Sequence, residues 1–327
     1  MPQGFGFIEV RASADFLGPG AIEINRYQPE ILDRVRRRYA FGQRITQTPA
    51  TGQPSRYFEQ LAIAGGAFTN PRQLNYVPGQ PNRVERVVSL KALIGGINFG
   101  IFDVETNQQQ GQFSYIEAKD LTDTVDGVLR THDLALWTGS DTSLAMPTSQ
   151  QYFGCSGQII NATVTGNGPT QVQTVASTGS LVDGFKHSVA LMIQRQDFEV
   201  RPSAAYSNPL YNDLFDQEAK QFQLYFNKVQ VLPGVVVNGI PTQAGVLPFI
   251  PDPAITVPGY RQAGPNTYDM FIVSEDLIEY HWLTNPLPRV FQLGLTSVLS
   301  AQYVVLKFGA VVVKGANYGH IVLRTTR

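Results

Sequence analysis

Apolar and polar positions follow their clearest pattern between residues 117 and 138. Apolar side chains and one histidine recur there at steps of three and four, which makes one stripe of a long helix apolar. The stripe consists of Ala118, Leu121, Val125, Val128, Leu129, His132, Ala135 and Leu136. Acidic residues lie near the amino end, and Gly139 suits the left-handed conformation that closes a helix. We therefore expect a helix over 117–138, with His132 facing the core and Ser140 and Asp141 beyond the helix end.

A second amphipathic helix is predicted near residues 180–195. Leu181, Phe185, Val189 and Ile193 share a face there, whereas His187 falls off this stripe and is expected to face solvent. Strands are expected at 93–105, 112–119 and 268–274, and a strand and short helix at 198–220. Further strands are expected as a hairpin within 226–243, and in 298–324 with turns at Gly309 and near Gly315. Ser274 can cap the segment that follows it. No alternating strand–helix–strand series is present, so the fold class is α+β.

Residues 51–91 contain two partly alternating runs, near 56–64 and 83–90, around a middle rich in Gly, Pro and Asn. This pattern predicts a long hairpin with too few apolar residues to form a core of its own. Such an arm must lie on the parent domain or on another chain. Residues 1–30 carry little periodicity and would not fold as an independent unit.

Composition narrows the class of protein. The chain of 327 residues has 16% charged residues and a net charge of −1, which disfavours a protein whose main activity is wrapping DNA. A single cysteine excludes an internal disulfide, and no apolar run reaches membrane-spanning length, so we expect a soluble protein folded in a reducing compartment. The 30 Gly and 21 Pro, with many uncharged polar residues, suit loops of an assembly subunit. The basic cluster is either a solvated or salt-bridged helix face, or a contact with nucleic acid or a neighbour's acidic surface: Arg34, Arg36, Arg37, Arg38 and Arg44.

The search for catalytic chemistry is mostly negative. Residues 153–158 lack the spacing of a nucleophile elbow, and the glycines at 95–100 miss the dinucleotide pattern and suit a closely packed strand. The four histidines are dispersed, and one cysteine gives a zinc site almost no soft ligands. Glu275 and Glu279 would share a helix face near His281, which allows acid–base chemistry but also describes a solvated helix start. We expect no catalytic, cofactor-binding or metal-binding residue and no enzyme activity.

The order of the parts is more distinctive than any motif. An unstructured amino-terminal arm, a long hairpin, a long helix ending in LALWTGSDTS, a loop-rich domain and the closing VVLKFGAVVVKGANYGHIVL follow one another. In this order the chain resembles the HK97-fold major capsid protein of tailed bacteriophages. The resemblance implies an N-arm at 1–48, an extended E-loop at 49–92, a peripheral domain with a spine helix at 93–149, an axial domain at 150–295 and return strands at 296–327.

The resemblance also implies a function. The chain would assemble into hexamers and pentamers of an icosahedral head around double-stranded DNA, in the virion and, during assembly, in the host cytoplasm. A scaffolding protein and a portal would be partners, with a cement or decoration protein as a further one, and no membrane. Arg34–Arg44 would face the DNA or clamp a neighbouring subunit. Because residues 55–90 hold no lysine, we expect no isopeptide cross-link. Candidate E-loop contacts are Arg56, Phe58, Phe68, Arg72 and Tyr76.

Two alternatives stay open. An encapsulin-like compartment of the same fold would enclose an enzyme instead of a genome. A cytosolic hydrolase would use Glu275, Glu279 and His281.

Overall fold

The computed structural model describes residues 41–62, 65, 66, 68, 70, 72, 79–100, 102, 113–162, 171–194, 200–221, 227–233, 235–258, 266–293 and 300–327. Contacts divide the chain into two units, Met1–Arg37 and Arg38–Arg327, and the fold below is that of the second unit. The expected arm at 1–30, four of the candidate arginines (Arg34, Arg36, Arg37 and Arg38) and Tyr76 lie outside the described residues. Mixed helices and strands confirm the α+β class.

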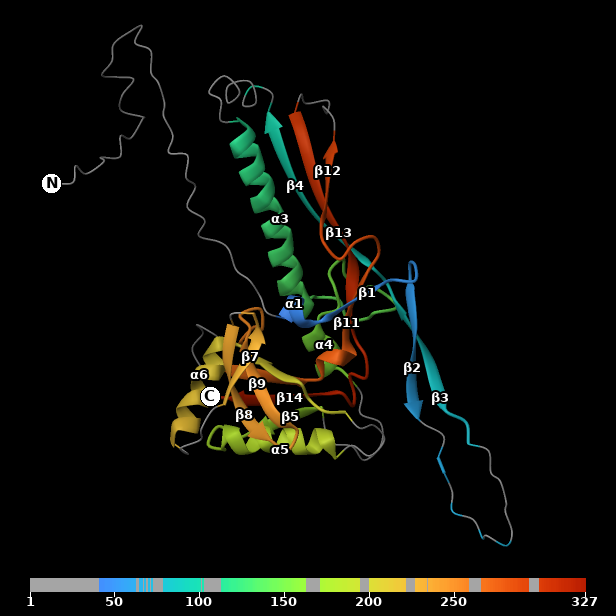
Figure 1. Cartoon of the computed structure of the whole chain (residues 1–327), viewed down its shortest axis with the longest axis vertical. Helices are drawn as coiled ribbons and strands as arrows, with labels where there is room; N and C mark the ends of the chain where they lie inside the picture. Colours follow the sequence, from blue (N-terminus) through green and yellow to red (C-terminus); the bar gives the residue numbers. More distant parts are fainter. Residues whose placement is uncertain are drawn as a thin grey trace, which may run out of the picture. The chain divides into compact units, whose positions relative to one another are not determined.

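The first sheet is built on one long strand, β13, whose two edges are both occupied. β11 and β12 pair in succession with one edge of β13, and β4 pairs with the other, all antiparallel, while β1 adds to β11 in parallel. The strands are β1 (Thr46–Pro49), β4 (Lys91–Gly100), β11 (Ile278–Trp282), β12 (Arg289–Leu293) and β13 (Ser300–Val313). The long helix α3 (Phe113–Thr138) runs along β4 and β13 (Figure 1).

Gly95 explains how closely α3 approaches this sheet. A Cβ atom at Gly95 would overlap the Val128 side chain of α3, so only glycine fits between helix and strand. The prediction of a closely packed strand at these glycines is therefore confirmed at Gly95, whereas Gly96 has no atom closer than 3.7 Å to its Cβ position. His132 is buried, as its place on the apolar stripe predicted.

The second sheet has seven strands in the order β5-β14-β10-β6-β9-β8-β7. They are β5 (Val172–Val175), β6 (Ala204–Ser207), β7 (Asn227–Leu232), β8 (Val235–Thr242), β9 (Gly245–Pro251), β10 (Thr267–Val273) and β14 (His320–Thr326). Alternate residues of β10 enter different cores: Met270 and Ile272 pack with α5 (Leu181–Ile193) and α6 (Pro209–Gln221), while Phe271 and Val273 face the first sheet's core. Ser180 caps α5, and His187 is exposed as predicted.

One continuous core connects the two sheets. Trp137, at the end of α3, packs against Phe41 of α1 (Phe41–Arg44), with ring centroids 4.3 Å apart, and against Phe271 of the second sheet at 5.1 Å. Helix α4 (Cys155–Ile160) contributes Cys155 and Ile159 to the same cluster. Because this cluster takes side chains from both sheets, the sheets share one core, while the other face of the second sheet forms a separate core with α5 and α6.

A third, two-stranded sheet is the predicted hairpin. β2 (Ser55–Ala62) pairs antiparallel with β3 (Asn82–Val88), and among the described strands these two pair with each other alone. Figure 1 shows the pair as a ribbon that continues β1 and leads into β4. The two alternating runs of the sequence are therefore confirmed as the strands of the hairpin.

Several local predictions were wrong. Gly309 lies inside β13 instead of a turn, paired with both neighbouring strands, and glycine is needed there because the Tyr280 ring and the His281 carbonyl occupy the space where a Cβ atom would be. Gly139 is not among the described glycines with positive φ; the Tyr152 carbonyl lies so close that no Cβ fits. Residues 113–119 belong to α3 instead of a strand, since adding a turn to an existing helix is easier than starting a new element.

The segment after Ser274 is also not the helix that would place Glu275 and Glu279 on one face. It is a single 3-10 turn, η2 (Glu275–Leu277), followed by β11. Residues 278–282 form a strand instead of a helix because they pair with β13 on one side and with β1 on the other, which outweighs the local sequence pattern. In the part of the chain that the structure describes, no helix has both the length and the apolar character needed to cross a bilayer.

Candidate functional site

The root of the hairpin is held to the body of the protein by polar contacts. A hydrogen bond of 3.1 Å joins Ser55 Oγ to His281 Nδ1 of β11. Glu59 accepts from the Gly315 backbone N–H at 2.8 Å and from Arg86 Nε at 2.8 Å. Both carboxylate oxygens of this largely buried side chain thus have a partner. The first residues of β2 therefore have a defined orientation.

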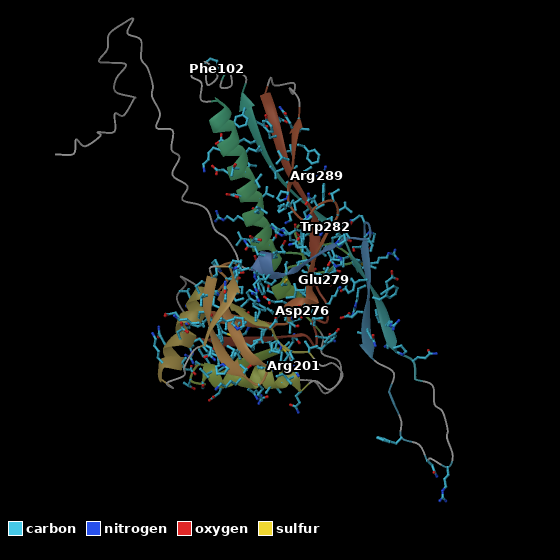
Figure 2. The ribbon with its side chains drawn as sticks, in the orientation of Figure 1. Phe102, Arg201, Asp276, Glu279, Trp282 and Arg289 are labelled. Carbon is cyan, nitrogen blue, oxygen red and sulfur yellow. The ribbon has the colours of Figure 1, made fainter. Side chains whose placement is uncertain are left out.

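Glu279 completes this root on the side of β11. Its Oε2 atom lies 3.1 Å from His281 Nε2 and accepts from Thr48 Oγ1 at 3.2 Å, while Oε1 pairs with Lys314. The hydrogen bond with His281, with smaller effects from Lys314 and Thr48, lowers the pKa of Glu279 to about 2 although burial opposes the shift. Figure 2 shows Glu279 on β11, between Asp276 and Trp282. We name this group, Ser55, Glu59, Glu279, His281 and Lys314, the hairpin root.

Ser55, His281 and Glu279 form a chain of hydrogen bonds that resembles a hydrolytic relay. The Ser55 side chain is only 1% exposed and His281 is buried, so a substrate has no access to the hydroxyl. Glu275, the third candidate of the hydrolase hypothesis, binds elsewhere. The described residues hold no group of three or more His, Cys, Asp or Glu side chains suited to a metal ion. The arrangement is suited to fixing the hairpin.

Arg44 is the one member of the basic cluster that the structure describes. Its Nε atom donates to Glu275 Oε1 at 2.6 Å, Nη2 pairs with Oε2, and Nη1 donates to the Val231 carbonyl at 2.7 Å. Glu275 also accepts from Tyr206 and, at 3.2 Å, from Ser203. These contacts lie within one chain and connect α1 to the junction of the two sheets. The prediction that Arg44 faces DNA or a neighbour is not tested by them.

Beyond its root, the hairpin presents several side chains to solvent. Phe58 is 74% exposed, and Phe68 and Arg72 are exposed as well. Arg56 pairs with Glu85 across the two strands at 3.0 Å. A large apolar ring held out on a two-stranded ribbon gains nothing within this chain, since burial is what makes such a ring favourable. Four of the five candidate contact residues, Arg56, Phe58, Phe68 and Arg72, therefore lie at exposed positions, and Tyr76 lies outside the described residues.

A second exposed apolar surface lies on the first sheet, opposite α3. In antiparallel pairs, directly opposite residues share a face, and the register places three rows of side chains on the face away from Val128. Ile94 is 66% exposed, Phe291 and Leu293 are exposed, and the Arg289 guanidinium lies 5.3 Å from the Phe291 ring centroid (Figure 2). The open sheet face consists of Ile94, Gly96, Asn98, Arg289, Phe291, Leu293, Gln302, Val304 and Leu306.

Sequence reasoning found part of these surfaces. The exposed hairpin positions follow from alternation, but Ser55 and Glu59 were missed because their partners are 226 and 256 residues away in sequence. The open sheet face was also missed. Its signal, apolar residues on the outward positions of β4 and β12, is readable only when the register is known.

Comparison with known proteins shows which fold this is. No protein-family model matches the chain, and no curated protein matches it in sequence. Among solved structures, the capsid of a native GTA particle aligns with a TM-score of 0.60 and 11% identity, over 97% of this chain and 98% of that one. A chain from the structure of Gordonia phage Cozz gives 0.56 and 12%, over 93% and 91%. The holo-SrpI encapsulin of Synechococcus elongatus PCC 7942 gives 0.55 and 13%, over 92% and 91%. This chain therefore has the HK97-like capsid fold that phage capsids and encapsulins share.

Proposed function

We propose that this chain is the major capsid protein of a tailed bacteriophage, which assembles with copies of itself into a closed shell. The observation that carries the proposal is the fold match to capsid chains, which covers almost the full length of this chain and of the capsid chains. The exposed hairpin and the open sheet face support it, because each leaves apolar area that one chain does not bury. Such a role needs no substrate and no turnover.

Assembly proceeds through many contacts of modest strength. The hairpin, acting as the E-loop, brings Phe58 to a neighbouring copy, while its root keeps it at a fixed angle to the sheet. Repeated heterologous contacts of this kind close by rotation into rings, which are the hexamers and pentamers of an icosahedral shell. The division into an N-arm (1–48), an E-loop (49–92), a peripheral domain (93–149), an axial domain (150–295) and return strands (296–327) belongs to the same proposal.

The neighbours in the shell are held without covalent bonds. Lys91, the lysine nearest the hairpin in sequence, donates to Asp141 Oδ2 at 2.6 Å and to the Ser149 carbonyl, and is mostly buried. An amine engaged in this way does not reach a neighbouring copy. A cement or decoration protein then stabilises the shell, and a scaffolding protein and portal act during assembly in the host cytoplasm. Arg34, Arg36, Arg37 and Arg38 face packaged DNA or a neighbouring subunit.

An encapsulin-like compartment is the second candidate, favoured by the likeness to the SrpI encapsulin. The contents of the particle separate the two. Particles from the native source that protect double-stranded DNA from nuclease support the phage capsid. Particles that instead enclose one protein cargo support the compartment.

The first test is negative-stain electron microscopy of the chain expressed alone and with its neighbouring genes. Closed shells, rings or tubes are expected, and uniform particles of one or two chains under both conditions would contradict the proposal. Phe58→Ser is expected to reduce assembly at least ten-fold in yield, on the order of 1.4 kcal/mol per contact, with no change in the urea midpoint of the unassembled chain. The control is Arg83→Ser, which removes an exposed polar side chain from the same hairpin and leaves assembly intact.

A further inference from the structure

Strand β12 is an edge of the first sheet that the rest of the described chain leaves uncovered. Its five residues pair with β13, and no described strand pairs with its outer edge (Figure 1). All five residues are exposed, although three of them, Val290, Phe291 and Leu293, are apolar. The outer side of an edge strand presents unpaired backbone N–H and C=O groups, which form a template for a further strand. The open sheet face therefore ends at an edge that can accept one.

The other described edge strands carry features that hinder such pairing. β7 has Lys228 and an irregular register, and the hairpin strands have exposed charges and an irregular register. β1 ends in Pro49, β5 has only four residues, and β4 is weakened by Gly95 and Gly96 in its middle. β12 has a regular register and contains no Pro, Gly or Lys, and its one charged residue, Arg289, is the first. This edge is thus the least protected against a partner strand.

The sequence of β12 is complementary to itself. Antiparallel pairing centred on Phe291 places this ring opposite Phe291 of a second copy, and aromatic pairs of this kind are favourable. Arg289 then lies opposite Leu293 of the second copy, and Val290 lies opposite Gln292, so no two like charges face each other. Among the described residues, Arg289 contacts the Phe291 ring and has no carboxylate partner. The strand can therefore pair with its own copy without electrostatic cost.

We propose that β12 pairs antiparallel with β12 of a second copy across a two-fold axis, so that their first sheets join into one. The inference rests on the proposed function, because a closed icosahedral shell of identical chains contains two-fold axes at which the same patch of two copies meets. An edge of five residues is too small for the roughly 1,000 Å² that a stable interface buries. The contact therefore forms within the shell, where other contacts support it, and does not make the free chain a dimer.

Disulfide trapping in assembled particles tests the pairing. Phe291→Cys places two thiols opposite each other, because opposite Cα atoms of antiparallel strands lie about 4.5–5.5 Å apart. A disulfide spans Cα atoms about 4.4–6.8 Å apart. The single natural cysteine, Cys155, is buried and does not compete. After mild oxidation of the particles, most of the Phe291→Cys chain is expected to run as a dimer on a non-reducing denaturing gel.

The matched control is Ile94→Cys, which lies on the open sheet face but on β4. Ile94 is 66% exposed and Phe291 39%, so random collisions would favour a disulfide at Ile94. In the joined sheet, the two copies of Ile94 are five strand spacings apart, roughly 24 Å, and no disulfide is expected. Particles in which Phe291→Cys stays monomeric on the gel, or in which Ile94→Cys cross-links to the same extent, would refute the pairing.

A pair of charge variants at one position tests the register. Leu293→Lys places an ammonium group opposite Arg289 of the second copy and should lower the yield of shells at least ten-fold, because like charges directly opposite are destabilising. Leu293→Glu creates an opposite-charge pair at the same place and should keep the yield of the unaltered chain. Leu293 is exposed, so neither change should move the urea midpoint of the unassembled chain. Equal yields for Lys and Glu would overturn the proposal.

The outcomes separate this contact from the proposed function. Shells of the unaltered chain in electron microscopy, without a Phe291→Cys cross-link, would leave the capsid function standing and remove the β12 contact alone. An unaltered chain that forms no shells under any condition would overturn both. If Phe291→Cys itself does not assemble, the comparison of Leu293→Lys with Leu293→Glu still decides whether β12 pairs with its copy.

Discussion

The contact between Arg44 and Glu275 should be the strongest single polar interaction at the junction of the two sheets. Arg44→Ala removes two charge-assisted hydrogen bonds to Glu275 and one to the Val231 carbonyl. The two side chains are 19% and 11% exposed, so water replaces little of what is lost. Each such bond contributes about 1.5–3 kcal/mol, and Glu275 keeps Tyr206 and Ser203 as partners. We expect a loss of about 3–5 kcal/mol in the free energy of unfolding.

A double-mutant cycle separates this pair from general damage. Urea unfolding of the unassembled chain can be followed by the fluorescence of its two tryptophans, of which Trp137 packs against Phe41 on helix α1, the helix that carries Arg44. Arg44→Ala, Glu275→Gln and the double variant should give a coupling energy of about 2 kcal/mol or more. The exposed pair Arg56–Glu85 is the control and should give less than about 1 kcal/mol. A coupling for Arg44–Glu275 as small as the control would refute the reasoning.

Two further predictions concern β13 and the hairpin root. Gly309→Ala should cost about 1–3 kcal/mol in the free energy of unfolding, because the new Cβ atom overlaps the Tyr280 ring. The control is Gly96→Ala, where the nearest atom is 3.7 Å away, and its effect should be near neutral. Equal urea midpoints for the two variants would contradict this account. Glu279 has its pKa lowered from 4.5 to about 2, so it stabilises the fold above about pH 4.5, and this contribution is lost as pH falls toward 2. Glu279→Gln should therefore flatten the acid limb of the stability curve by about 2–3 kcal/mol, and an unchanged limb in acid titrations would count against the hairpin root.

Elements with a repeating pattern were predictable from the sequence. The helix at 117–138, the helix near 180–195 and the two strands of the hairpin all appear, because burial on one face imposes a period of 3.6 or 2 on the chain. β11 was not predictable in the same way. Its five residues become a strand because β1 and β13 pair with both of its edges, and neither neighbour is near it in sequence.

Glycines show the same limit more sharply. α3 does end directly before Gly139 as predicted, but Gly139 does not adopt the predicted left-handed conformation, and Gly309 does not form the predicted turn. Both glycines instead allow close approach of Tyr152 and Tyr280. The requirement lies in a residue from another part of the fold. The candidate surfaces divide similarly: Phe58 could be predicted from alternation, but Ser55, Glu59 and the open sheet face depend on long-range register.

The open sheet face also affects how the chain behaves before it assembles with its partners. Beside it, β4 and β12 each pair with β13 alone among the described strands, so no described strand covers their outer edges. A free edge next to exposed apolar side chains is a template for incorrect association between chains. In newly made subunits, ordered assembly therefore competes with aggregation, and the rates of both processes rise with concentration. The level of expression, more than the stability of the core, will determine whether assembly or aggregation predominates.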